Sequence, residues 1–363
     1  MRLHVRTDNA SRLAIGCSYM QTYGARRKRE GAAKRRIRAA AWLDGAVAHA
    51  VSEKEPPSGG FELSMAGRGR GAIRIGEGVY KVEHRIKMIG LDLDGTLLNE
   101  KKEITPYSRN VIKKALDAGI IVLVATGRPW MGIPEELREF PGMRYALTSN
   151  GARIIDREKG TVMKEQLLSV ELAKKALEIC GKYDTLQEVY LDGQGYAPND
   201  KRDKVERYHH NPNMWEYIRT TRIWVDDICE FTEKGNKGLD KIQALFADMA
   251  ERTKAWEELS GVRGLALVGS LGYNIEINAA GVNKGAGLVE LGKLLGIKRE
   301  EIMACGDGDN DTEMLREVGV GVAMANGEEQ VKKAADYITE SNEADGAAKA
   351  IEKIALGGGE RIC

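Results

Sequence analysis

Five short apolar runs stand at intervals along residues 86–324, separated by polar segments with helical spacing. Each run is nearly continuous and rich in β-branched residues, which is typical of strands buried on both faces of a parallel sheet. Strands that alternate with helices predict an α/β fold built on a doubly wound parallel sheet. The predicted strands are Ile86–Leu93, Ile120–Ala125, Tyr145–Ser149, Ile302–Cys305 and Val320–Met324.

One helix is predicted between the first two strands. Thr105 is a suitable N-cap, Pro106 fits the first turn and Gly119 fits the C-terminal stop. The apolar stripe of this helix comprises Val111, Ile112, Ala115 and Leu116. Because the helix fills the segment, no further domain is expected there.

About 150 residues separate Thr126 from Lys284, far more than one strand–helix unit needs. We therefore expect a second α/β domain over residues 169–272, inserted into a core made of residues 88–168 and 273–363. Its predicted elements are helices Val170–Lys182 and Gly238–Lys254 and strands Glu188–Leu191 and Ala266–Gly269.

The segment Asn199–Arg219 of this second domain is polar and irregular. It contains His209 and His210, and paired histidines raise the question of a metal site. No third ligand stands at a supporting spacing, so a solvated loop is the favoured interpretation.

Two carboxylates follow the first predicted strand, in the string Asp92-Leu93-Asp94-Gly95-Thr96-Leu97. Two acids so close together, separated only by Leu93, suit a division of labour between Asp92 and Asp94. Gly95 permits a tight turn that brings both acids near a ligand. A bare pair of acids at a strand end is usually solvated. The full six-residue string is far harder to obtain by chance, which favours a functional role for both acids.

Two other predicted strands also end in polar loops. Thr126 and Gly127 follow the second strand, where a hydroxyl and backbone amides can hold phosphate. The strand at residues 302–305 leads into Gly306-Asp307-Gly308-Asp309-Asn310-Asp311, a density of hard oxygen ligands that favours Mg²⁺ or Ca²⁺. An EF-hand is excluded because its sixth and twelfth positions, counted from Asp307, are Thr312 and Val318 instead of Gly and Glu.

A site with this many acids needs a cation as well as a metal, because the carboxylates would otherwise repel one another and an anionic substrate. Lys284 is the best candidate, in the string Gly281-Val282-Asn283-Lys284-Gly285 between an alternating strand and a helix start. An arbitrary Lys is usually solvated, and only its place among the other motifs singles this one out.

In order along the chain, D-x-D-G-T, T-G-R, G-V-N-K-G and G-D-x-x-N-D resemble the four motifs of the haloacid dehalogenase-like (HAD) phosphohydrolases. The G-V-N-K-G string resembles the Cof-type branch, and the matching region runs from about Met88 to Gly346. The resemblance implies a Rossmann-like HAD core with a type 2 (IIB) α/β cap domain over the active site. Asn150-Gly151-Ala152 also resembles a Cof-type string near the core–cap junction, although a simple β-turn explains it equally well.

The resemblance implies an Mg²⁺-dependent phosphomonoester hydrolase that acts on small phosphorylated metabolites, with sugar phosphates expected. Asp92 would form an aspartyl-phosphate and Asp94 would serve as general acid and base. Thr126, Gly127, Lys284 and Asn310 would bind the phosphoryl group. Mg²⁺ would be held by Asp92, the backbone carbonyl of Asp94, Asp307 and Asp311.

Two alternatives from other classes stay open at this point. The same core supports phosphomutases such as the phosphomannomutases, in which a second hydroxyl replaces water and no inorganic phosphate is released. A non-catalytic Cof-like regulatory protein is disfavoured because every motif residue is present.

The near-zero net charge of the 363-residue chain hides an asymmetry. Residues 1–87 hold 18 Lys and Arg against eight Asp and Glu, and look like a basic, disordered extension. A nucleic-acid or membrane-surface arm and an organellar transit peptide are possible interpretations. We favour a third, an upstream start codon, and expect a chain beginning at Met88 to keep full activity.

Five scattered cysteines with no C-x-x-C pair suit a reducing, cytoplasmic location. No apolar stretch is long enough to cross a membrane, which argues against a P-type ATPase with the same nucleophile motif. The expected partner of the core is a small phosphate ester, with no nucleic acid or membrane.

Overall fold

The computed structural model describes residues 85–357 and, within residues 2–81, the backbone of several strands. The chain divides into two compact units, Met1–Arg85 and Ile86–Cys363. In the first unit β4 (Arg38–Leu43) pairs antiparallel with β5 (Ala46–Val51), and a short pair joins β2 (Arg6–Thr7) and β3 (Leu13–Ala14). A four-stranded sheet has the order β1-β6-β7-β8, with bounds Arg2–Leu3, Phe61–Met65, Gly71–Ile75 and Gly78–Lys81.

These strands differ from the disordered extension that the sequence predicted. The segment Phe61–Met65 alternates apolar and polar residues, which is a strand pattern inside the extension that we interpreted as disordered. The basic runs at residues 26–29 and 34–36 lie outside the described residues, and there the prediction of disorder stays a prediction.

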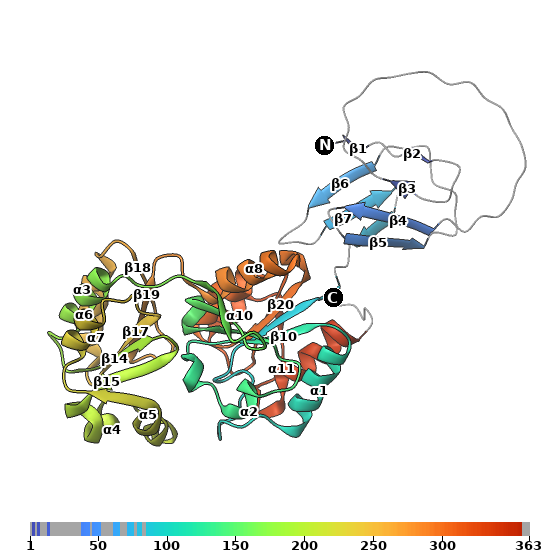
Figure 1. The fold of residues 1–363 in the computed structure, drawn as a ribbon. Helices are drawn as coiled ribbons and strands as arrows, with labels where there is room; N and C mark the ends of the chain where they lie inside the picture. Colours follow the sequence, from blue (N-terminus) through green and yellow to red (C-terminus); the bar gives the residue numbers. More distant parts are fainter. Residues whose placement is uncertain are drawn as a thin grey trace, which may run out of the picture. The chain divides into compact units, whose positions relative to one another are not determined.

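The second unit contains an eight-stranded sheet with the order β13-β12-β11-β10-β9-β20-β21-β22 (Figure 1). The strands from β11 to β22 run parallel, and β12 and β13 add an antiparallel edge. All five strands predicted for the core are confirmed, as β9, β10, β11, β20 and β21. In sheet order from β13 to β22 the bounds are Thr161–Glu165, Arg153–Asp156, Tyr145–Thr148, Ile121–Ala125, Met88–Leu91, Ile302–Gly306, Val320–Ala323 and Tyr337–Ile338.

Helices cover both faces of this sheet, as the alternation of buried side chains on β9 requires. Ile89 packs in one apolar cluster with Val111 of α1 (Pro106–Asp117) and with α11 (Gly346–Ala350). Met88 packs in the opposite cluster with Leu288 of α8 (Lys284–Leu295) and with α9 (Thr312–Glu317). The doubly wound α/β core is therefore confirmed, with α2 (Glu135–Arg138) and α10 (Glu329–Ala334) as shorter additions.

The predicted limits of α1 are confirmed in atomic detail. The Thr105 side chain accepts a hydrogen bond from the Ser108 amide, Pro106 begins the helix, and Gly119 follows it with a φ of +79°. The C-terminal positive φ is a conformation that glycine adopts without steric cost.

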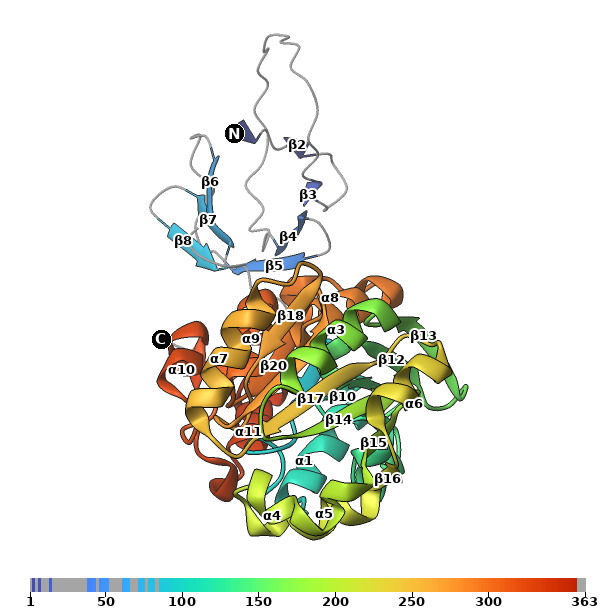
Figure 2. The same cartoon turned by 90° about the vertical axis from the view of Figure 1, so that its left-hand side faces the viewer.

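The inserted domain is a six-stranded sheet with the order β16-β15-β14-β17-β19-β18, antiparallel except for the pair β15–β16. Helices α3 (Val170–Cys180), α6 (Ile228–Gly235) and α7 (Met249–Ser260) pack on one face of it (Figures 1 and 2). In order along the chain, the bounds of β14 to β19 are Thr185–Leu191, Gln194–Pro198, Arg222–Val225, Lys241–Phe246, Leu265–Val268 and Asn274–Ala279. The predicted cap helix at 170–182 and both predicted cap strands are confirmed, as α3, β14 and β18.

The predicted helix Gly238–Lys254 is wrong. Residues 241–246 form the central strand β17, and the helix α7 starts only after Asp248, whose carboxylate accepts hydrogen bonds from the amides of Ala250 and Glu251. The overlooked signal is this N-cap with a Glu three residues on, which marks a helix start.

The strand β19 also moves the predicted end of the insertion. Residues 274–279 were assigned to the core, but β19 pairs with β17 and β18 in the six-stranded sheet. The second chain crossing between the two sheets therefore lies after Ala279. The alternation of apolar and polar residues in this strand does not indicate which sheet it joins, because a strand in either sheet would have one buried face.

The predicted solvated loop at residues 199–219 is also wrong. It folds into short helical segments that include α4 (Val205–Tyr208) and α5 (Trp215–Thr221). His209 is buried, and its Nδ1 lies 3.1 Å from the hydroxyl of Tyr273. Within residues 85–357, the group of three potential metal ligands that lie close together is Asp92, Asp307 and Asp311, and it contains no histidine.

Candidate active site

Three predicted acids meet where β9 and β20 end. Asp92 follows β9, Asp307 and Asp311 follow β20, and one carboxylate oxygen from each lies within 4.8 Å of the others. Neighbouring parallel strands end at the same edge of the sheet, so loops 215 residues apart in sequence are brought together.

Lys284 lies among these acids. Its Nζ donates to Oδ1 of Asp92 at 2.7 Å and to Oδ1 of Asp311 at 2.6 Å, and its side chain is 1% exposed. The helix α8 starts at this residue, capped by Asn283, whose side chain accepts from the Ala286 amide. The cation predicted for the site therefore comes from the first turn of a helix packed on the core sheet.

The acid cluster carries more negative charge than Lys284 balances. Burial raises the pKa of Asp92 well above its usual range, and the neighbouring Asp311 and Asp307 carboxylates act in the same direction. Burial and Asp311 raise the pKa of Asp307 to about 7. Burial alone would lower the pKa of Lys284, but the Asp311 and Asp92 carboxylates raise that pKa above its usual value. Such a set of hard oxygens with excess charge fits a divalent cation.

The turn after β9 is built to admit Asp307. Gly95 has a φ of +82°, and a Cβ placed there would lie 2.2 Å from Oδ2 of Asp307. Thr96 donates from Oγ1 to the other oxygen of that carboxylate at 2.7 Å. The backbone amides of Asp307 and Gly308 donate to Oδ2 of Asp311, which holds the acidic loop closed.

Asp94 faces away from the three acids, toward two cations. Arg128 binds both of its oxygens at 2.7 Å, and Lys102 lies 2.7 Å from Oδ1. Although burial favours the neutral acid, Arg128 and Lys102 lower the pKa of Asp94 well below its usual range. The carboxylate of Asp94 is thus ionised and lies outside the cluster of potential metal ligands found among the described residues.

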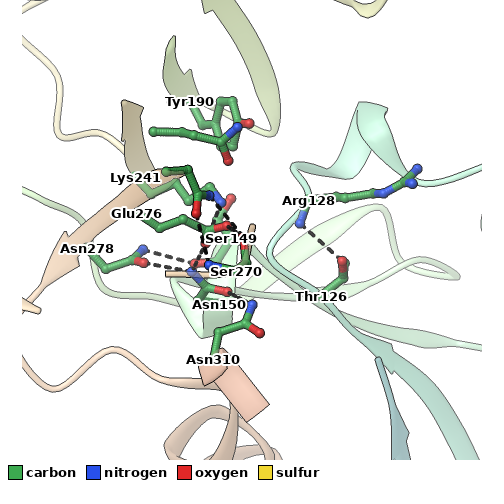
Figure 3. A network of polar contacts seen from close by, with 12 residues as sticks. Thr126, Arg128, Ser149, Asn150, Tyr190, Lys241, Ser270, Glu276, Asn278 and Asn310 are labelled. Atoms are coloured by element: carbon green, nitrogen blue, oxygen red, sulfur yellow. Dashed lines mark hydrogen bonds and ion pairs between the residues drawn. The ribbon is translucent and has the colours of Figure 1, made fainter. Parts of the chain in front are cut away.

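Thr126 and Gly127 lie at the end of β10, beside β9. Thr126 is buried, and its Oγ1 accepts from the Arg128 amide at 3.1 Å (Figure 3). A Cβ on Gly127 would lie 3.0 Å from Oδ1 of Asn150 and 3.2 Å from Oε2 of Glu276. The backbone at Gly127 is therefore in close contact with polar side chains from both sheets.

A cavity of about 140 Å³ lies over these residues, and residues of the inserted domain line its other side. Asp92, Asp94, Thr126, Gly127, Asn310, Asp307 and Asp311 line it from the core, while Lys284 lies behind Asp92 and Asp311. The structure thus brings together every site residue that the sequence predicted. From the inserted domain it adds Tyr190, His209, Tyr217, Arg222, Lys241, Gln243, Ser270 and Glu276.

These added residues come mainly from one face of the six-stranded sheet. Cross-strand pairs join Tyr190 to Lys241 and Gln243 to Glu276. The alternate residues of the same strands, such as Ile242 and Ile277, pack under the helices of the other face. Since successive side chains of a strand point to opposite faces, the sheet is apolar under its helices and polar toward the cavity.

Sequence reasoning missed these cap residues for a definite reason. Lys241 and Gln243 alternate with apolar residues, which predicts a half-buried strand, but we assigned this segment to a helix. A correct strand assignment would have placed them on a polar face, which is normally solvated. Only the tertiary structure turns this face toward the catalytic loops.

Comparisons with known proteins point in the same direction. The family model of the haloacid dehalogenase-like hydrolases matches residues 89–351. A Bacillus subtilis protein named 5-amino-6-(5-phospho-D-ribitylamino)uracil phosphatase YcsE is 34% identical over 281 residues, which cover 77% of this chain and 99% of that protein. A second Bacillus subtilis phosphatase of the same name, YwtE, is 30% identical and covers 75% of this chain and 99% of its own length.

Solved structures show the same fold. A haloacid dehalogenase-like hydrolase from Bacillus subtilis superposes with a TM-score of 0.67 at 28% identity, over 74% of this chain and 99% of that one. The HAD subclass IIB sugar phosphatase BT4131 superposes with a TM-score of 0.63 at 25% identity, over 74% of this chain and 99% of its own.

The fold and the site define a class of enzymes with a doubly wound α/β core, buried acids at the strand ends and an inserted α/β domain. Within that class, the chain belongs to the haloacid dehalogenase-like hydrolases. One of its structural neighbours is named a subclass IIB protein, the subclass that the resemblance of the motifs implied. In the part of the chain that the structure describes, none of the helices combines the length and the apolar character needed to span a membrane.

Proposed function

We propose that this protein is an Mg²⁺-dependent phosphomonoester hydrolase that works through an aspartyl-phosphate on Asp92. The observation that carries the proposal is the position of Asp92 itself, buried at a strand end, held by Lys284 and beside two further acids. The family and the phosphatase names of its relatives support the same reaction.

In the first step a carboxylate oxygen of Asp92 forms a bond to phosphorus while the bond from phosphorus to the leaving oxygen breaks. Lys284 holds one oxygen of Asp92 in place, so the other is the free nucleophile. The leaving oxygen takes up a proton and departs as an alcohol. Water then attacks phosphorus, loses a proton to a base and releases phosphate, which restores Asp92.

Asp94 is the candidate to receive that proton, because its carboxylate lines the cavity and is ionised beside Arg128 and Lys102. For Asp94 to donate a proton to the leaving oxygen, it must first take one up, and the same two cations oppose this. The general-acid step therefore requires that the substrate or a movement of Arg128 loosens these contacts. The base role requires the same loosening, because a carboxylate whose pKa is held low by two cations is a weak base.

Asp92, Asp307 and Asp311 are the residues that would hold Mg²⁺, together with the backbone carbonyl of Asp94. Burial and the neighbouring carboxylates raise the pKa values of Asp92 and Asp307, and a divalent cation bound beside them would offset that repulsion. When bound there, the ion would supply charge neutralisation for the phosphoryl oxygens.

Four residues would hold the phosphoryl group from other sides. Thr126 contributes a hydroxyl, Gly127 a backbone amide, and Asn310 a side-chain amide, all of which line the cavity. Lys284 contributes its charge from behind Asp92 and Asp311. Fixed donors of this kind stabilise charge that develops during phosphoryl transfer.

The cap residues favour a leaving group rich in hydroxyls. Lys241 and Arg222 offer donors, Glu276 and Gln243 offer acceptors, and Tyr190 and Tyr217 offer ring faces within one cavity. Relatives are named for a phosphate on a ribityl chain, and a structural neighbour is named a sugar phosphatase. We therefore infer that the substrate is a phosphorylated sugar or sugar alcohol.

Release of inorganic phosphate from a panel of sugar and polyol phosphates tests the proposal, with Mg²⁺ and with EDTA. We expect metal-dependent release from a few related compounds by the full chain, and none by its Asp92→Asn variant. Interconversion of phosphate positions without phosphate release would favour a mutase instead. Turnover that persists in the Asp92→Asn variant would refute the nucleophile.

A further inference from the structure

Asn150 is the residue of the core that contacts the cap and the acidic loop at the same time. Its Nδ2 donates to Oε2 of Glu276 at 2.5 Å and to Oδ1 of Asn278 at 3.0 Å, both on β19 (Figure 3). Its Oδ1 accepts from Nδ2 of Asn310 at 3.3 Å. Both amide hydrogens and the carbonyl oxygen of this buried side chain are therefore engaged.

The backbone of Asn150 is fixed by the strand that carries the phosphate-binding residues. Its amide donates to the carbonyl of Thr126, and the amide of Ser149 donates to the carbonyl of Arg128, each at 3.0 Å. Asn150 itself has a φ of +62°, a left-handed conformation that Asn tolerates better than most residues do. The turn therefore fixes the direction of the Asn150 side chain toward its hydrogen-bond partners.

On the cap side, the network ends in a buried ion pair. Glu276 lies 2.8 Å from Nζ of Lys241, and both side chains are at most 4% exposed. Ser270 donates to the remaining oxygen of Glu276 at 2.6 Å. Lys241 and Glu276 both line the cavity, so a leaving group held by the cap meets this pair directly.

On the core side, the network ends beside the phosphate-binding residues. Asn310 stands next to Asp311 in the acidic loop and lines the cavity. The atoms Oδ1 of Asn150, Oε2 of Glu276 and Nδ2 of Asn310 all lie within 3.5 Å of the position that a Cβ of Gly127 would take. The three side chains therefore converge on the backbone amide region where phosphate is expected.

We propose that Asn150 is a positioning residue that couples the Lys241–Glu276 pair of the cap to the orientation of Asn310 in the phosphate-binding loop. The inference rests on the proposed function, since it assigns phosphate to that loop. Glu276 orients the amide of Asn150, and the Oδ1 of Asn150 in turn accepts a hydrogen bond from Nδ2 of Asn310. A change at the cap pair is then transmitted to phosphate binding without any direct contact.

Inorganic phosphate is the probe that isolates this coupling, because it has no leaving group to touch the cap. Its dissociation constant in the presence of Mg²⁺ is measured by calorimetry on the full chain and its variants. Asn150→Gly deletes the side chain and keeps the positive φ free of strain. We expect about fivefold to tenfold weaker phosphate binding, the usual consequence of losing one oriented hydrogen bond.

A double-mutant cycle then tests the link to the cap. Glu276→Met keeps the shape of the side chain and removes its acceptor, so it should also weaken phosphate binding in the wild-type background. In the Asn150→Gly background it should have no further effect. Glu276→Gln keeps a neutral acceptor and disturbs Lys241 less, so it should weaken phosphate binding by a smaller factor. This effect should also disappear in the Asn150→Gly background.

Glu188→Gln is the matched control, since Glu188 is a buried cap carboxylate paired with Arg222, whereas the Asn150 side chain bonds to Glu276, Asn278 and Asn310 among the described residues. It should leave phosphate affinity unchanged. Unchanged affinity in Asn150→Gly overturns the proposal, as do equal losses from Glu276→Met in both backgrounds. Failure of the proposed function looks different: the wild-type chain then neither releases phosphate from any ester nor binds it.

Discussion

The ammonium group of Lys284 lies 2.7 Å from a carboxylate oxygen of Asp92, although 192 residues separate the two in sequence. Both side chains are buried, and Asp311 shares the same ammonium group. Each charge is therefore tolerated only because the others are present. Lys284 is at once a structural counter-ion and a candidate phosphate ligand.

Lys284→Met should reveal both roles. Removing one partner of a buried ion pair typically costs about 3–5 kcal/mol, so the free energy of unfolding should fall by an amount of that order. Turnover should fall at least about a hundredfold, because Asp92 loses its orientation and phosphate loses a cation. Chemical denaturation and phosphate release measure the two effects, and a fully active variant would exclude Lys284 from the site.

Metal removal should make stability depend on pH through Asp307. Its pKa is raised from 3.8 to about 7, so between these values the folded state binds more protons than the unfolded state. Stability of the metal-free protein should consequently decrease as pH rises from about 4 to about 7. Thermal unfolding in EDTA measures this slope, and saturating Mg²⁺ should abolish it.

Gly95→Ala should abolish activity. The new methyl group would meet the Asp307 carboxylate at 2.2 Å, and φ of +82° is strained for any other residue. Gly119→Ala is the control, because Gly119 has a similar φ of +79° with nothing within 4 Å of its Cβ position. Both variants should lose about 1 kcal/mol of stability from backbone strain, but only Gly95→Ala should lose Mg²⁺-dependent turnover.

Arg128→Gln should shift the pH dependence of catalysis. Arg128 is the main cause of the lowered pKa of Asp94, and Lys102 alone would hold that pKa less far down. If ionised Asp94 is the base that acts on water, the acidic limb of the pH profile of kcat should move to higher pH in the variant. A limb that stays in place would show that Asp94 does not set it.

From the sequence alone, the motif residues and their order indicated the family, the apolar runs predicted the core strands, and the two together predicted that the acids converge. This succeeded because each motif follows a buried apolar strand, and parallel strands must end at one edge of their sheet. The loops after β9, β10 and β20 therefore had to meet. The caps of α1 were equally local, since Thr105 and Gly119 act within a few residues.

The tertiary structure alone decided how the cap meets the core. The pairing of β19 with β17, the left-handed turn at Asn150 and the polar face formed by Lys241 and Glu276 all depend on contacts between distant segments. It also turned Asp94 toward Arg128 and away from the other acids. Burial and ion pairing depend on which surfaces of the folded chain pack against each other. A local pattern of residues does not determine that packing.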